Sequence, residues 1–262
     1  MLNSSRKHKQ LPIPFRPRLE ILEDRTLLSV CTVDRLTDTG EGKGDMGDLR
    51  YCITNAADGD TITFGVTGTI NLTGVLPDLT HNISIEGPGS DLMTVRRNTG
   101  GNYRIFTVAT GVTASITGLT ITNGNGIGGG VWSNGILTVT NSSISGNYGN
   151  PGGIANGGTL TVSNSTISGN HTNDIFPGGG GILNYGQLTV SNSTISGNTA
   201  LSGSSTSGGG IYQDFAGTLI ITNSTISNNT ARNGGGISQL RGTIIANNCT
   251  ISGNSADYGG GG

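Results

Sequence analysis

Apolar and polar residues recur in a fixed order through the second half of the chain. Each unit opens with two glycines and one aliphatic residue, and successive openings lie 23, 28, 29 and 26 residues apart. A segment follows in which aliphatic residues alternate with threonine, as in Leu137-Thr138-Val139. Self-similarity at such a period indicates a repeat protein. The five opening aliphatic residues are Val131, Ile154, Ile182, Ile211 and Ile237.

The alternation within each unit predicts β-strands with one buried face, because successive side chains on a strand point to opposite sides. The units are rich in Val, Ile and Thr, which favour strands, and no stripe of helical period runs through them. One unit buries too little apolar surface to fold alone, whereas stacked units share one core. We therefore predict an all-β fold, a right-handed parallel β-helix of about eight turns with three short strands per turn.

Amide side chains recur at two further positions and predict hydrogen-bonded ladders between turns. An asparagine follows each alternating segment, and we expect it to adopt positive φ, to face inward and to bond the same amide one turn away. A second amide column follows the opening aliphatic residue, at Asn156, Asn184, Gln213 and Gln239. The first ladder is expected to contain Asn141, Asn164, Asn192, Asn223 and Asn248.

The chain divides into three parts. Residues 1–30 are basic and lack the apolar core of an ordinary signal peptide, which predicts a disordered export or sorting segment. Residues 31–64 are expected to form an N-terminal cap, in which a helix over Asp48–Ala57 covers the end of the core with Leu49 and Ile53. Residues 65–262 are expected to form the β-helix, with regular repeats from about 128. Residues 61–123 are a less regular version of the same pattern, with strand candidates at Ile62–Phe64, Ile70–Leu72, Ile83–Ile85, Leu92–Val95, Ile105–Val108 and Ile116–Ile121.

The sequence stops at Gly259–Gly262, where a further unit would begin. We expect this C-terminal end to be uncapped. A truncated product, or end-to-end self-association through the open end, would each account for it.

The composition of the chain argues against several classes of function and fold. The chain has 47 glycines among 262 residues, only 11% charged residues and a net charge of −2. The absence of a basic excess argues against nucleic-acid binding. No run of 18 apolar residues occurs, so no membrane-spanning helix is expected, and the glycines do not follow the collagen period.

Charged residues become sparse after Arg104, which argues against catalysis. Lyases of acidic polysaccharides need clustered carboxylates for Ca²⁺ and a basic side chain, and hydrolases need two or three carboxylates around one bond. Asp174 and Asp257 share a position in the repeat but lie three turns apart, ~14 Å at one strand spacing per turn. We therefore predict no catalytic residues and no cofactor. A Ca²⁺ site among the acidic cap residues stays open as an alternative, although no ligand spacing supports it. The charged side chains after Arg104 are Asp174, Asp214, Arg232, Arg241 and Asp257.

Aromatic and cysteine residues are the remaining candidates. Trp132 and Tyr212 follow equivalent inward aliphatic residues three turns apart, so both are expected to point outward as glycan contacts. Cys31 and Cys52 both fall in the cap, where either a disulfide or two free thiols are consistent with the sequence. Cys249 takes a repeat position that serine holds in other units.

Several segments resemble families of exported bacterial proteins. Asp48-Leu49-Arg50-Tyr51-Cys52-Ile53, Asn55, Gly59-Asp60-Thr61-Ile62 and Phe64 resemble the CSLREA segment that opens many secreted β-helix proteins, although Asp48 replaces its usual Ser and Tyr51-Cys52 its Glu-Ala. Ile85-Glu-Gly-Pro-Gly and Gly118-Leu-Thr-Ile-Thr-Asn-Gly are similar to segments of the pectin-lyase-like superfamily. The repeats from 128 resemble those of polymorphic outer-membrane proteins, and Arg16–Ser29 resembles the LEPR-XLL motif.

These resemblances imply a protein of the bacterial cell envelope, outer-membrane surface or extracellular space. Together with the sparse charges, they favour a non-catalytic structural or adhesive role with extracellular glycans or other surface proteins as partners. The alternatives are a polysaccharide lyase or glycoside hydrolase, because the fold hosts many functions, and a glycan-binding module.

Overall fold

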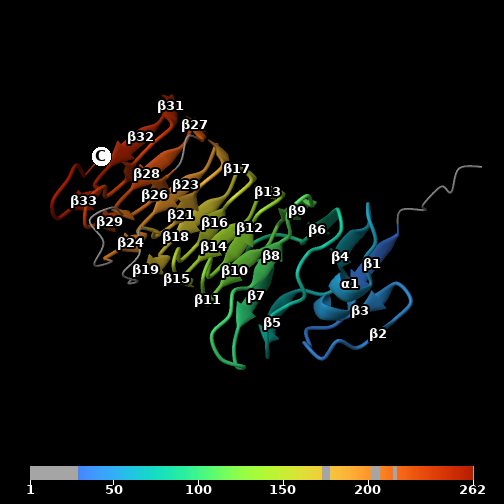
Figure 1. Cartoon of the computed structure of the whole chain (residues 1–262). Coiled ribbons are helices and arrows are strands. Elements are labelled where there is room, and N and C mark those ends of the chain that lie inside the picture. The colour runs from blue at the N-terminus through green and yellow to red at the C-terminus, as the bar shows by residue number, and fades with distance from the viewer. Residues whose placement is uncertain (1–28, 173–177, 202–206, 215–216, 262) are drawn as a thin grey trace, which may run out of the picture.

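The computed structural model describes residues 29–172, 178–201, 207–214 and 217–261. Nearly all of the segment expected to be disordered, residues 1–28, lies outside this part of the chain. The described residues form an elongated parallel solenoid that starts at the cap, drawn in blue, and runs to the last strands, drawn in red (Figure 1). The predicted all-β fold is confirmed.

Sheet A carries the longest strands of the repeats, and its pairs are parallel except for β2 with β3. These strands are the alternating segments recognised in the sequence. In spatial order, sheet A contains β2 (Gly42–Lys43), β3 (Met46–Gly47), β1 (Val30–Val33), β4 (Thr61–Phe64), β6 (Ile83–Glu86), β9 (Thr113–Thr117), β13 (Ile136–Thr140), β17 (Thr159–Ser163), β22 (Gln187–Ser191), β27 (Thr218–Thr222) and β31 (Thr243–Asn247).

Sheet B follows sheet A in each turn and supplies one inward aliphatic residue per regular strand. The sequence candidate Ile116–Ile121 is in fact split between sheets A and B, because Gly118 turns the chain with a φ of +66°. Sheet B contains β5 (Gly68–Leu72), β7 (Met93–Arg97), β10 (Thr120–Thr122), β14 (Ser143–Ser145), β18 (Thr166–Ser168), β23 (Thr194–Ser196), β28 (Thr225–Ser227) and β32 (Thr250–Ser252).

Sheet C holds the strands that open each unit, and it precedes sheet A in the next turn. Four of its strands, between Val131 and Gln213, begin with a buried aliphatic residue and end with a buried polar one. The first strand instead begins with Phe106 and ends with Val108, both buried and apolar. Sheet C contains β8 (Phe106–Val108), β12 (Val131–Ser133), β16 (Ile154–Asn156), β21 (Ile182–Asn184), β26 (Ile211–Gln213) and β30 (Ile237–Gln239).

Sheet D is a fourth strand position that the sequence pattern did not predict. Its strands are two residues long and carry no large aliphatic residue. Only alanine recurs, at Ala200, Ala231 and Ala256, so no strong hydrophobic period reveals them. A further pair, β20 (Gly178–Gly179) with β25 (Ser207–Gly208), packs on β21 and β26. Sheet D contains β11 (Asn125–Gly126), β15 (Tyr148–Gly149), β19 (His171–Thr172), β24 (Thr199–Ala200), β29 (Thr230–Ala231) and β33 (Ser255–Ala256).

The core consists of equivalent aliphatic side chains stacked in register. Leu137 pairs with Leu160, which pairs with Leu188, and all three are buried. Successive turns of the solenoid approach closely at their corners. Gly186 has no room for a side chain, because a Cβ there would collide with the carbonyl oxygen of Gly158. The column of aliphatic residues predicted from the repeats therefore exists.

The cap closes the N-terminal end of this core. Its helix α1 (Leu49–Asn55) begins after Asp48, whose carboxylate accepts a hydrogen bond from the Tyr51 amide at 2.8 Å. A carboxylate at this position satisfies an amide that the first turn of a helix leaves without a partner. Leu49 and Ile53 are buried as predicted, and Cys52 is buried beside them.

Candidate functional site

Three of the four residues predicted for the second amide column form an inward ladder in sheet C. The fourth, Gln239, is exposed and donates to the carbonyl oxygen of Gly242, so the prediction is wrong for this residue. Asn156 donates from Nδ2 to Oδ1 of Asn184 at 2.6 Å, and Asn184 donates from Nδ2 to Oε1 of Gln213 at 2.6 Å. All three side chains are fully buried. Each amide therefore satisfies the next one in a place that water cannot reach.

The first predicted ladder is wrong in its direction, although its backbone geometry is right. Asn141, Asn164, Asn192, Asn223 and Asn248 have φ values of 50°, 49°, 49°, 50° and 51°. All five side chains are exposed, because the left-handed corner between sheets A and B turns them outward. Asn248 donates to Asn223 at 2.8 Å, but this contact lies on the surface.

A different row of asparagines makes the main inward ladder. Each Nδ2 donates to Oδ1 of the next asparagine at 3.0, 3.0, 2.9 and 3.0 Å, and the backbone N–H groups of the first four donate to the same oxygens. These residues end the Ser-Gly-Asn and Ser-Asn-Asn segments that close each unit. The row contains Asn147, Asn170, Asn198, Asn229 and Asn254.

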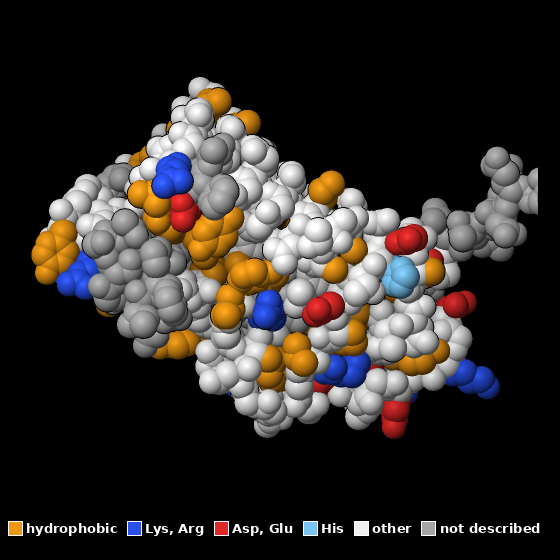
Figure 2. Space-filling model, in the orientation of Figure 1, with side chains coloured by type: hydrophobic (Ala, Val, Ile, Leu, Met, Phe, Trp, Pro, Cys, Tyr) orange, Lys and Arg blue, Asp and Glu red, His pale blue; other side chains and the backbone are white. Residues whose placement is uncertain are grey.

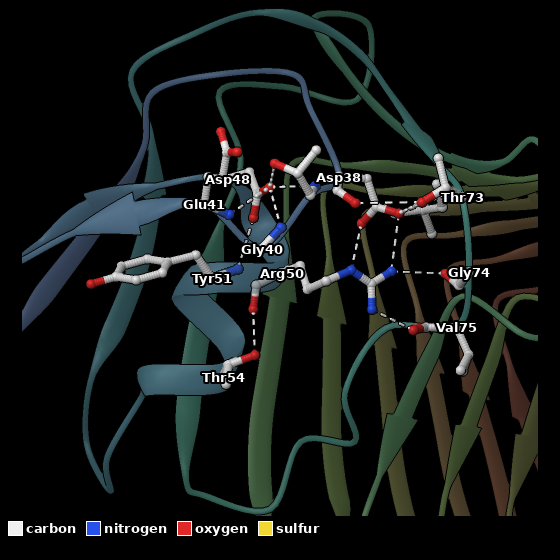
Figure 3. Close-up of polar contacts among 12 residues, drawn as sticks. Asp38, Gly40, Glu41, Asp48, Arg50, Tyr51, Thr54, Thr73, Gly74 and Val75 are labelled. Atoms are coloured by element: carbon white, nitrogen blue, oxygen red, sulfur yellow. Dashed lines mark hydrogen bonds and ion pairs between the residues drawn. The ribbon is translucent and has the colours of Figure 1, made fainter.

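An ion pair anchors the cap to the first turns of the solenoid (Figure 3). Arg50 Nε and Nη2 donate to the two oxygens of Asp38 at 2.9 and 3.0 Å, and the Asp38 side chain is 1% exposed. Asp38 also accepts from the backbone and hydroxyl of Thr73 at 2.6 and 2.9 Å. The remaining Arg50 donors reach the carbonyl oxygens of Gly74 and Val75 at 2.9 and 2.6 Å. Arg50 therefore fixes the segment that follows β5.

Other acidic cap residues also have structural partners. Asp48 accepts from the backbone amides of Thr39 and Gly40, each at 2.7 Å. Asp60 accepts from the amides of Ser29 and Ala57 at 2.8 Å each. Burial by itself raises the pKa of Asp60, but these hydrogen bonds outweigh burial, and the pKa lies below its ordinary value.

Cys31 and Cys52 form a disulfide. Of the two alternatives that the sequence left open, a disulfide or two free thiols, the structure therefore has the disulfide. The bond links β1 to α1 and joins two parts of the cap that lie 21 residues apart. Cys249 is a free thiol in the part of the chain that the structure describes. It occupies the serine position of the repeat, with Sγ 3.2 Å from the Asn247 carbonyl oxygen.

Trp132 and Tyr212 lie in one outward row of sheet C, but only Trp132 is accessible. The register runs from Trp132 through Ala155 and Leu183 to Tyr212, which places the two rings three turns apart as expected. Tyr212 is 0% exposed, so the prediction that it offers a surface contact is wrong. The glycine strands β20 and β25 pack directly on β21 and β26 and leave this part of the row covered.

An open pocket of about 440 Å³ surrounds Trp132. The Arg104 guanidinium carbon lies 5.3 Å from the centre of a Trp132 ring, which is a cation–π distance. Val75 and Ile127 add apolar surface, and Asp78 also lines the pocket. The sequence singled out Trp132 but missed its companions. Asp78 and Arg104 belong to the irregular half, where no repeat predicts which residues become neighbours.

The charged residues considered for catalysis or metal binding are spread over the coil. Asp214 follows sheet C, whereas Asp257 follows sheet D, and Asp174 lies outside the described residues. Within the residues that the structure describes, no group of three His, Cys, Asp or Glu side chains has the arrangement of a metal site. On the face drawn in Figure 2, charged side chains gather mainly over the N-terminal end.

The architecture and its inward ladders define a repeat protein of the parallel β-solenoid class. Residues 104–262, more than half of the chain, match the family model described as "Right handed beta helix region", and the chain belongs to this family. No curated protein matches the sequence.

Among solved structures, the crystal structure of pectate lyase Pel9A is similar, with 12% sequence identity and a TM-score of 0.49. The match covers 87% of this chain and 78% of the lyase. In the described part of the chain, the sole helix is α1, and no helix has the length and apolar character required to cross a membrane.

Proposed function

We propose that this chain is a non-catalytic β-helix with a structural and adhesive role on the outer surface of a bacterial cell. The continuous stack of buried aliphatic and amide side chains carries the proposal, because it makes the coil a stiff support along its whole described length. Outward positions of the long strands are filled mainly by short hydroxyl side chains, as in Thr138 and Thr161. The partners would be extracellular glycans or other surface proteins.

The cap supports export of the chain. Disulfides such as Cys31–Cys52 form and persist mainly in oxidising compartments outside the cytoplasm. The acidic residues Asp38, Asp48 and Asp60 hold the cap together through hydrogen bonds, so they already have a structural role. The CSLREA-like and LEPR-XLL-like segments point to the same cellular location.

Surface exposure is tested on intact cells that produce the full chain. Protease added outside the cells should degrade the protein, and thiol labelling of the denatured, unreduced protein should modify Cys249 but neither Cys31 nor Cys52. Recovery of an intact protein with all three cysteines labelled would contradict an exported, surface-displayed product.

Catalysis is tested separately with the purified chain. Incubation with polygalacturonate, xylan and soluble cellulose derivatives should create no new reducing ends above a heat-denatured control. Cleavage that disappears in Asp214→Asn would establish a polysaccharide lyase or hydrolase and would contradict the non-catalytic role.

A further inference from the structure

We propose that the pocket around Trp132 binds a short stretch of a glycan chain that runs along the solenoid axis. This inference rests on the proposed adhesive function and names the surface through which it would act. It is carried by the arrangement of Asp78, Arg104 and Trp132 with their neighbours on the outside of sheet C.

The register places the carboxylate and the indole in one outward row. Leu79 bridges Val108 in parallel, and the Leu79 amide donates to the carbonyl oxygen of Thr107 at 2.8 Å, so Asp78 falls in the turn before Thr107. Thr107 in turn pairs with Trp132. Two strand spacings therefore separate Asp78 from Trp132, about 10 Å along the axis. One pyranose unit of an extended glycan advances by roughly the length of one such spacing, so two advances along the row connect about three successive units.

The pocket offers both kinds of surface that a sugar presents. A pyranose has apolar C–H faces and a rim of hydroxyl groups, and it stacks on aromatic rings while its hydroxyls bond polar side chains. Trp132 supplies the aromatic ring. Ile127 and Val75 line the same pocket and are 57% and 53% exposed, so their side chains add apolar surface that a ligand can reach. Asp78 and Asn134 line the pocket and supply hydrogen-bond acceptors and donors.

Arg104 has two uses in this site. Its guanidinium lies over the Trp132 ring and restrains the ring's orientation. Among the described residues, Arg104 takes part in no side-chain hydrogen bond or ion pair, so its N–H groups can donate to ligand oxygens. Asp78 balances its charge in the pocket, which suits hydroxyl-rich chains of low charge.

The residues on either side of the pocket limit the length of glycan that it can bind. Beyond Trp132 the outward row continues with Ala155 and Leu183, which are 1% and 3% exposed, so a glycan cannot continue over those turns. At the opposite rim, Arg50 of the cap holds the Val75 carbonyl oxygen at 2.6 Å. The site is therefore short and built partly by the cap.

Tryptophan fluorescence can report on this pocket directly, because Trp132 is the sole tryptophan of the chain. The full chain is titrated with purified mono-, tri- and pentasaccharides of the cello, xylo, manno, chito and galacturono series. We expect at least one series to change the emission, with the trisaccharide binding about tenfold tighter than the monosaccharide and the pentasaccharide adding little. Calorimetry with the same sugars supplies dissociation constants for variants that lack the indole.

The variants separate the pocket from the rest of the surface. Trp132→Ala should weaken trisaccharide binding at least about tenfold, Trp132→Phe should restore part of it, and Asp78→Asn and Asn134→Ala should each weaken it several-fold. Asp78 and Asn134 are exposed, so these two variants test the site even if Trp132→Ala folds poorly. Tyr148→Ala is the matched control, because Tyr148 is an exposed aromatic residue whose ring contacts His171 in sheet D.

Three outcomes would overturn the inference. These are no response to any of the sugars, unchanged binding by the Asp78, Asn134 and Trp132 variants, or an equal loss in Tyr148→Ala. Absent binding together with normal surface exposure would remove the glycan site and leave the structural role. Binding followed by cleavage of the sugar would keep the site and remove the non-catalytic role.

Discussion

Buried asparagines hold successive turns of this solenoid in register. Asn198 is fully buried, donates to Asn229 and to the Ile167 carbonyl oxygen, and accepts from both the backbone and the side chain of Asn170. Loss of this one side chain therefore leaves several buried polar groups without partners, which costs more than the bonds themselves contribute.

Asn198→Ala is expected to lower the free energy of unfolding by about 3 kcal/mol, because it leaves the donors of Asn170 and the Ile167 carbonyl oxygen unsatisfied. Chemical denaturation followed by circular dichroism measures the change. Asn192→Gly is the matched control. Asn192 is exposed at a φ of 49°, a conformation that glycine adopts easily, so this variant should unfold like the wild type. Equal losses in both variants would contradict an inward role for Asn198.

Asp60 gives the cap a dependence on acid pH. Its pKa is lowered in the folded chain, so its stabilising effect is complete above the pKa of the unfolded chain and is lost as pH falls through the folded value. Between about pH 5 and pH 3, wild-type stability should therefore fall more steeply than that of Asp60→Asn, which cannot ionise. Thermal melts across this range measure the difference, and parallel slopes would count against the assignment.

At the scale of elements, the cap is attached to the coil by Arg50. Arg50→Ala removes the partner of the buried Asp38 carboxylate and releases the carbonyl oxygens of Gly74 and Val75, so we expect a loss of about 3 kcal/mol. Hydrogen exchange should show faster exchange in β1, α1 and β5 than in the regular turns. Arg35→Ala breaks the ion pair with the neighbouring Asp34, which is open to solvent, and should have little effect. An equal loss in the control would indicate a general charge effect.

The strands that carry a repeated aliphatic pattern could be predicted from the sequence, whereas the strands and corners without such a pattern could not. Leu137, Leu160 and Leu188 lie at equal positions in units of nearly equal design, so their stacking followed from spacing alone. Sheet D was missed because strands such as Tyr148–Gly149 have no aliphatic period. Which face an asparagine takes at a corner depends on the exact turn. For that reason the inward ladder was assigned to Asn192 and its equivalents instead of to Asn198 and its equivalents.

The pocket was less predictable than the fold. Trp132 was recognised because it occupies a repeat position that also holds Tyr212. The burial of Tyr212 depends on the glycine strands β20 and β25, which the sequence showed only as runs of glycine. Asp78 and Arg104 reach the pocket from irregular segments, and only the three-dimensional arrangement brings them together.

At the scale of the whole molecule, each regular turn makes contacts chiefly with its two neighbours, so a complete turn should be removable. Deletion of residues 165–192 joins Asn164 to Ser193 at equivalent positions and lets Asn147 meet Asn198 in the ladder. We expect this variant to keep its β circular dichroism and cooperative unfolding. Deletion of residues 165–178 removes only part of a turn, breaks the register and should cause aggregation. Failure of the full-turn variant to fold would show that the turns are not interchangeable.

The asparagine row also gives the solenoid a polarity. Each of the four side-chain amides from Asn147 to Asn229 donates toward the later neighbour, and the Asn156–Asn184–Gln213 row does the same. The small dipoles therefore add along the axis instead of cancelling, with their positive ends toward the later turns. A turn stacked in the reverse orientation would bring two amide nitrogens or two amide oxygens face to face, so the row favours turns that are added in one orientation.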